Sequence, residues 1–220
     1  MKKGDFVWAL LLAAIIAFLV IPVTNKIFIE TTAAHPFLMG FIKFAILATM
    51  GEFLAIRILK GSWIKPVGFV YKMIVWGIIG ILVTYMFNLF NSGVIATVDK
   101  GLLPLGNGLF ATIIIAFLTS AIMNLTFGPM FMAAHRISDN FIDGACLKQK
   151  KKVSQIIADM DWNEFIRFVI GKTIPFFWIP MHTISFLLPS EYRILSAAFL
   201  SIALGGILAY AKRKGEKKEA

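Results

Sequence analysis

Long apolar stretches alternate with short polar ones along almost the whole chain. Six stretches are long enough to cross the roughly 30 Å of a bilayer core as helices. They cover residues 6–22, 37–59, 67–90, 109–134, 165–188 and 194–211. The pattern predicts an all-α, polytopic membrane helix bundle of six transmembrane helices, forming one integral membrane domain over residues 1–220.

The connecting segments are short except for residues 138–164. Val153, Ile156, Ile157 and Met160 recur there at helical spacing, behind the lysines Lys148, Lys150, Lys151 and Lys152. This fits an amphipathic helix on the cytoplasmic membrane surface, with anionic lipid headgroups as partners. A solvated connector explains the same pattern equally well. Residues 161–164 form an Asp-x-x-Glu capping box that predicts the start of the fifth span.

Composition supports the membrane interpretation and narrows the function classes. Hydrophobic residues make up 59% of the chain, charged residues 15%, and the mean hydropathy is +0.81. Six spans leave no room for a large soluble catalytic domain. The single cysteine, Cys146, excludes an internal disulfide or a cysteine-based zinc site.

The net charge of +10 is distributed very unevenly between the two sets of loops. One set carries Lys2, Lys3, Arg57, Lys60, Lys65, Lys72, Arg136, Lys148, Lys150, Lys151, Lys152, Lys212, Arg213, Lys214, Lys217 and Lys218. The opposite set carries only Lys26, Lys100 and Arg193. This asymmetry predicts that both termini are cytoplasmic. Because the charge is spread over loops and not gathered on one folded face, nucleic acid is not expected as a partner.

The first stretch resembles a signal peptide, because Lys2 and Lys3 precede an apolar run. No small-residue cleavage site follows it, so we expect an uncleaved signal anchor. The chain has no Arg-rich amphipathic presequence, which favours a prokaryotic plasma membrane over import into an organelle.

The second stretch contains Lys43, Glu52 and Arg57, which hydrocarbon tolerates only near water or a partner. Lys43 and Arg57 lie toward the ends and can extend to the membrane surface. Glu52 lies deeper, on one helical face with Ala45, Ala48, Thr49 and Ala55. Small residues at this spacing mark a face that packs on other helices, so Glu52 should point into the bundle. Its role there is either functional, in a pathway, or structural, as a hydrogen-bonded carboxyl.

Small and polar residues also follow one face of the third, fourth and sixth stretches. The polar members of these faces in the third and fourth stretches are Thr84, Asn88, Asn91, Thr112, Ser120 and Asn124. Close helix packing explains such faces without any solute. The other interpretation is a narrow polar pathway lined by Glu52, Asn88 and Asn124.

The fifth stretch contains Pro175 and Pro180, which remove two backbone donors and predict an interrupted helix. His182 follows directly, either as a packing residue or as part of a binding site or gate. The three histidines fall at different depths, so no metal site is expected. The chain shows no catalytic triad pattern and no phosphate-binding loop, so we expect neither an enzyme nor a bound cofactor.

The order of several motifs is similar to that of a known family. The motifs are Ala33-Ala34-His35-Pro36, Gly51-Glu52, Pro180 with Ser185-Phe186, and the Pro-x-x-Tyr-Arg element Pro189, Tyr192 and Arg193. They resemble the twenty-two-kilodalton peroxisomal membrane protein family, with this chain as a distant, prokaryotic relative of its mitochondrial inner-membrane member. The resemblance covers residues 28–214 and implies a small helical membrane protein proposed to act as a pore.

Two functions therefore remain open at the level of the sequence. The first is a channel or transporter for ions or small polar solutes, with Glu52 setting the local charge and Asn88 and Asn124 among the lining residues. The second is a non-conducting scaffold that organises the membrane or binds a partner, with the polar faces serving only as packing surfaces. A homo-oligomer is compatible with both.

Overall fold

The computed structural model describes residues 2–149 and 151–219, and within these ranges it contains helices and no strand. The long helices are α1 (Lys3–Val20), α3 (Pro36–Lys60), α4 (Phe69–Asp99), α5 (Leu109–Cys146) and α9 (Ser190–Glu219). The shorter elements are α2 (Pro22–Ala34), α6 (Val153–Ala158), α7 (Trp162–Glu164), the π-helix η1 (Phe165–Trp178) and α8 (Ile179–Leu187). The all-α class is confirmed, and the five long helices are long and apolar enough to cross a membrane.

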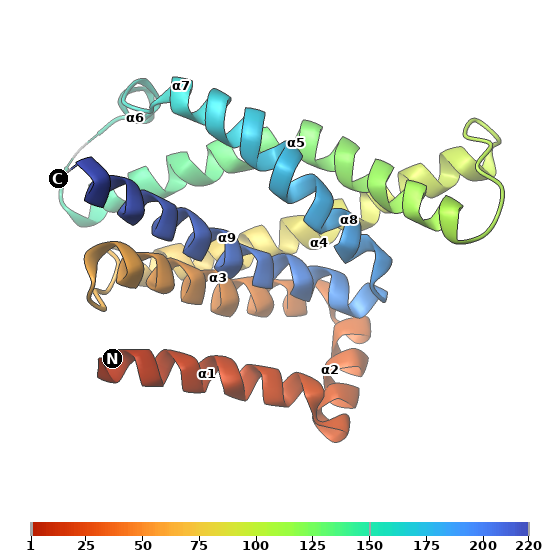
Figure 1. The fold of residues 1–220 in the computed structure, drawn as a ribbon, viewed down its shortest axis with the longest axis horizontal. Helices are drawn as coiled ribbons and strands as arrows, with labels where there is room; N and C mark the ends of the chain where they lie inside the picture. The colour runs from red at the N-terminus through yellow and green to blue at the C-terminus, as the bar shows by residue number, and fades with distance from the viewer. Residues whose placement is uncertain (1, 150, 220) are drawn as a thin grey trace.

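The long elements run back and forth along one axis (Figure 1). The start of α1, the 61–68 segment, α6 and the end of α9 lie at one end, which we call the basic end. Helix α2, the 100–108 segment and the α8–α9 turn lie at the opposite end, the far end. Along this axis η1 and α8 follow one another as a single rod. The loops with most of the lysines and arginines are therefore on the same side of the bundle.

The predicted boundaries agree well for α3 but fail after Ala134. There the hydropathy falls, yet α5 continues to Cys146, so residues 138–146 are helical and not part of a loop. The expected surface helix shrinks to α6, in which Ile156 is buried while Val153 is exposed. A helix does not have to stop where it leaves the apolar region, because its polar residues here pack against the start of α4. Lys150 lies outside the described residues.

Helix α3 lies at the centre and packs on both α4 and α9. A Cβ atom on Gly80 would collide with the backbone of Gly40, so α3 and α4 approach at these two glycines. A Cβ atom on Gly51 would lie 3.0 Å from the Cα atom of Ile202, so α3 and α9 are also close. Gly80 belongs to the small-residue face of the third stretch, so this face is a packing surface where it meets α3.

Helix α1 is peripheral and contributes no buried residue. The indole Nε1 of Trp8 donates to the carbonyl oxygen of Met50 over 3.0 Å, and Arg57 Nε lies 2.7 Å from Asp5 Oδ1. Arg57 is therefore paired within the protein at the basic end. Lys43 was expected to extend to the membrane surface, and this is wrong. Its Nζ is buried and donates to Thr32 Oγ1 and to the carbonyl oxygen of Glu191, at 3.2 Å each.

Candidate functional site

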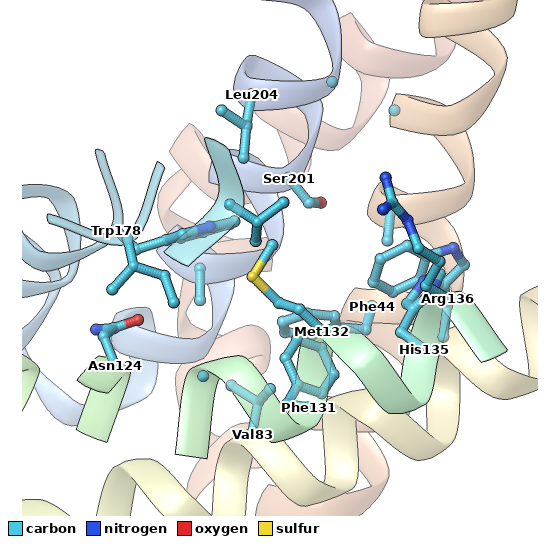
Figure 2. A pocket seen from close by; sticks show the side chains of 18 of the residues that line it. Phe44, Val83, Asn124, Phe131, Met132, His135, Arg136, Trp178, Ser201 and Leu204 are labelled. Carbon is cyan, nitrogen blue, oxygen red and sulfur yellow. The ribbon is translucent and has the colours of Figure 1, made fainter. Parts of the chain in front are cut away.

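Helices α3, α4, α5, η1, α8 and α9 surround a cavity of about 450 Å³ that extends from the middle of the bundle toward the basic end (Figure 2). Most of its lining is apolar, and much of it is aromatic: Phe44, Phe87, Phe127, Phe131, Phe165 and Trp178. The volume lies within the range of about 300–1,000 Å³ that is typical of small-molecule sites. The polar side chains of the lining gather at the two ends of the cavity.

Asn124 on α5 and His182 on α8 form the deep end. His182 Nδ1 lies 3.1 Å from Nδ2 and 3.2 Å from Oδ1 of the Asn124 amide, while that Nδ2 also donates to the carbonyl oxygen of Ser120 over 2.8 Å. The rings of Phe87 and Trp178 lie 5.2 and 5.0 Å from the imidazole, centroid to centroid. These contacts fix the imidazole in a buried position with one edge on the cavity.

One helical turn farther toward the far end, the side chains of α4, α5 and α8 pack closely against one another. The rings of Phe87 and Phe186 stack with centroids 4.7 Å apart, and Ser120 Oγ donates to the carbonyl oxygen of Ile179 over 2.7 Å. Ser120 and Ser185 are both 0% exposed. We call Phe87, Ser120, Ser185 and Phe186 the closing layer, because it separates the cavity from the far end.

Glu52 lines the cavity near the basic end, as the alanine face around it predicts. Its Oε1 lies 3.6 Å from Lys72 Nζ, which lies only 2.9 Å from Asp143 Oδ1. Lys72 on α4 therefore connects α3 with α5. The Glu52 side chain is 23% exposed, so the cavity is not sealed at this end, while Asp143 lies outside the lining and is 42% exposed.

A second polar group at this end comes from α5 alone. His135 Nδ1 lies 3.4 Å from Asp139 Oδ2, one helical turn away. The Arg136 guanidinium lies 6.0 Å from the centre of the Phe165 ring and points into the cavity (Figure 2). Within the described residues no carboxylate lies within ion-pair distance of Arg136.

Four buried polar atoms in the lining have no hydrogen-bond partner within the described part of the chain. They are Trp178 Nε1, His182 Nε2, His135 Nε2 and Asp139 Oδ1. A buried polar group without a partner costs about 1–3 kcal/mol, so such atoms are normally satisfied by water or a ligand. Their concentration around a single cavity makes this cavity the candidate site.

The cavity brings together Glu52, Asn124 and His182 but not the other predicted lining residues. Thr84 and Ser120 are buried in packing contacts, where Thr84 Oγ1 donates to the carbonyl oxygen of Gly80 over 2.7 Å. Asn88 is exposed on the outer face of α4. The predicted narrow polar pathway through Glu52, Asn88 and Asn124 is therefore not formed, because Asn88 lies outside a cavity whose lining is mostly apolar.

The two prolines of the fifth stretch change the helix type without interrupting the backbone. Pro175 lies within η1, whose last turn bonds the Ile179 N–H to the carbonyl oxygen of Ile174. Pro180 lies in the first turn of α8, which continues directly from η1. Because π-helical segments are frequent at functional sites, it is relevant that η1 supplies Ile174 and Trp178 to the cavity.

The Pro-x-x-Tyr-Arg element lies at the far end and builds a corner. The Tyr192 N–H donates to the carbonyl oxygen of Pro189 over 3.0 Å, and the Tyr192 hydroxyl accepts from Asn25 Nδ2 over 2.6 Å. Arg193 Nε donates to the carbonyl oxygen of Leu188 over 3.0 Å. In this arrangement the element joins α8, α9 and α2 and does not touch the cavity.

Lys72, His135, Arg136, Asp139 and Trp178 lie in or beside the site but are not among the residues predicted from the sequence. Ending the fourth span at Ala134 placed three of them beyond the helix. The spacing of His135, Asp139 and Asp143, four residues each, was the signal that α5 continues with a polar face. His135 and His182 share the cavity, but at its two ends, and no group of three or more His, Cys, Asp or Glu side chains suited to a metal occurs in the described ranges.

Comparison of the chain with models of protein families, with curated proteins and with solved structures gives no match.

Proposed function

We propose that this protein crosses the membrane six times, with both termini in the cytoplasm, and carries a small organic solute in its central cavity. The observation that carries the proposal is the cavity itself, with four unpartnered buried polar atoms in its lining. The cavity is open toward the basic end, which the excess of lysine and arginine assigns to the cytoplasm. The sixth crossing is the η1–α8 rod, which has the same course as the five long helices.

A carrier fits the geometry better than a permanently open channel. The closing layer leaves the cavity accessible from one side only, with Ser120 and Ser185 fully buried. A transporter alternates between states open to either side, whereas a channel needs a continuous path. The mostly apolar lining also favours an organic molecule over a bare ion, because an ion needs oxygen ligands along its whole path.

Two further expectations from the sequence are part of this proposal. Lys148, Lys151 and Lys152 would attract anionic headgroups at the cytoplasmic surface, with Lys150 beside them in sequence. The resemblance to the twenty-two-kilodalton peroxisomal membrane protein family implies the same broad class, a membrane conduit. A non-conducting scaffold remains the competing function and is one outcome of the test below.

Side-specific thiol labelling tests the proposal without knowledge of the solute. Cys146 is the single cysteine and is exposed, so a Cys146→Ser background is simple to prepare. Ser201→Cys places a thiol in the cavity lining, and Ala116→Cys places one in the packed core outside the lining. In oriented vesicles, a membrane-impermeant maleimide should label Ser201→Cys from the cytoplasmic side only and leave Ala116→Cys unlabelled.

Each other result overturns part of the proposal. Labelling of Ser201→Cys from both sides at equal rates would indicate an open channel. Labelling from neither side would indicate a sealed cavity and favour the scaffold. Labelling of Ala116→Cys as fast as Ser201→Cys would contradict the closing layer.

A further inference from the structure

We propose that the solute of this cavity is a hydrophobic organic cation: a bulky apolar body that carries a permanent positive charge. The inference rests on the proposed function, because it assigns a chemical class to the molecule that the cavity carries. Three observations point to this class: the aromatic lining, the charge of the open end and the position of one unpaired carboxylate oxygen.

The lining provides the surface that organic cations prefer. Six phenylalanine and tryptophan rings, together with Trp76, line the space. The negative face of an aromatic ring attracts a cation, and the attraction grows to about 2 kcal/mol or more where water is excluded. Cations without N–H donors use such rings in place of hydrogen bonds.

The charges at the open end leave an excess of negative charge. Glu52 and Asp139 contribute two carboxylates to the lining and Arg136 contributes one cation, while Lys72 and Asp143 pair with each other just outside it. Counted with ionised carboxylates and a neutral His135, the group has one negative charge more than positive ones. A cation in the cavity would restore neutrality, whereas an anion would add to the excess.

The distances show which carboxylates are free to meet that cation. Lys72 Nζ is closer to Asp143, at 2.9 Å, than to Glu52, at 3.6 Å. Glu52 is therefore only partly compensated. Asp139 uses Oδ2 for its contact with His135, while its buried Oδ1 has no partner within the described residues. Both side chains belong to the lining of the cavity that the aromatic rings surround.

Two ions of the same shape and opposite charge test the inference directly. Binding of tetraphenylphosphonium and of tetraphenylborate to the purified full-length chain in a neutral detergent is measured by equilibrium dialysis. We expect saturable binding of the cation and none of the anion. Equal affinity for the two ions would show that the cavity selects only for apolar surface and would overturn the assignment.

Charge-neutralising variants then show which carboxylates recognise the cation. We expect Asp139→Asn and Glu52→Gln each to weaken tetraphenylphosphonium binding by about tenfold. Glu30→Gln is the matched control, because Glu30 is exposed on α2 and its change removes the same charge without touching the cavity. Size-exclusion chromatography of each variant checks that it is folded. Wild-type affinity in both cavity variants would overturn the proposal.

The outcome is separable from that of the labelling experiment. If Ser201→Cys is labelled from the cytoplasmic side while tetraphenylphosphonium does not bind, the carrier stands and the cation class is wrong. If the thiol is labelled from neither side, the carrier itself is wrong.

Discussion

The two halves of this bundle are built from the same kinds of residues but packed in different ways. In the far half, glycines bring α3 and α4 into backbone contact, and serine hydroxyls find carbonyl partners in a layer with no exposed surface. In the basic half, the helices enclose a space of about 450 Å³ and leave buried polar atoms without partners. Polar side chains therefore form hydrogen bonds between helices in the far half, whereas in the basic half they line an unfilled cavity.

The difference follows from where the helices touch. Helix α8 packs on both α5 and α9, so the far end is closed on that side. Toward the basic end η1 diverges from α9, and the two separate progressively toward α7 (Figure 1). The space between them is not filled by larger side chains, because small residues such as Gly128, Gly205 and Ala48 line it. The same pattern of small residues thus gives a packed helix interface where a neighbouring helix lies close, and a cavity where it does not.

The largest expected effect on stability comes from a substitution in the packed half. Gly80→Ala places a Cβ atom against the Gly40 carbonyl group, 2.7 Å from its carbon, where only a shift of one whole helix gives room. We expect the free energy of unfolding in detergent to fall by about 3 kcal/mol. Gly93→Ala on the same helix is the control, because nothing lies within 4 Å of its added atom. Equal stability of the two variants would contradict the close α3–α4 contact.

A smaller effect is expected at the charged end of the open half. Lys72→Met leaves the Glu52 and Asp143 carboxylates without their shared cation, and we expect a loss of about 2 kcal/mol in the free energy of unfolding. The partial exposure of both carboxylates keeps this loss below that of a fully buried pair. Lys26→Met removes an exposed pair with Glu30 and should change stability by less than about 0.5 kcal/mol. If both variants unfold at the same temperature, Lys72 does not hold the three helices together.

Much of the fold was predictable from the sequence because hydrophobic periodicity is a local signal. The boundaries of α3 and the inward direction of Glu52 follow from residues close in the chain. The N-terminal cap of α7 is likewise local, since Asp161 Oδ1 accepts the Glu164 N–H over 2.8 Å. Such features need no knowledge of which helices are neighbours.

The site was only partly predictable because its chemistry depends on tertiary contacts. Thr84 and Asn124 look alike in the sequence, each in a stripe of small and polar residues. Thr84 meets a glycine of α3, whereas Asn124 meets His182 at the edge of an open space. Lys72 was counted as a loop charge, although it lies 8% exposed between two carboxylates from other helices. A pattern along one helix cannot show how closely the next helix approaches.

The smallest expected effect is the counterpart of the first, a glycine change in the open half. Gly128 lines the cavity, and a Cβ atom there would come no closer than 3.5 Å to Ile174 Cδ1, an ordinary contact. Alanine is the better helix former, but its Cβ atom would meet the ring of Pro129, the next residue of α5. Because the two effects oppose one another, Gly128→Ala should change the free energy of unfolding by less than about 1 kcal/mol. The measurement is the thermal unfolding midpoint beside that of Gly80→Ala. A loss as large as that of Gly80→Ala would mean that η1 packs on α5 as tightly as α3 packs on α4, and the open half would then be closed in solution.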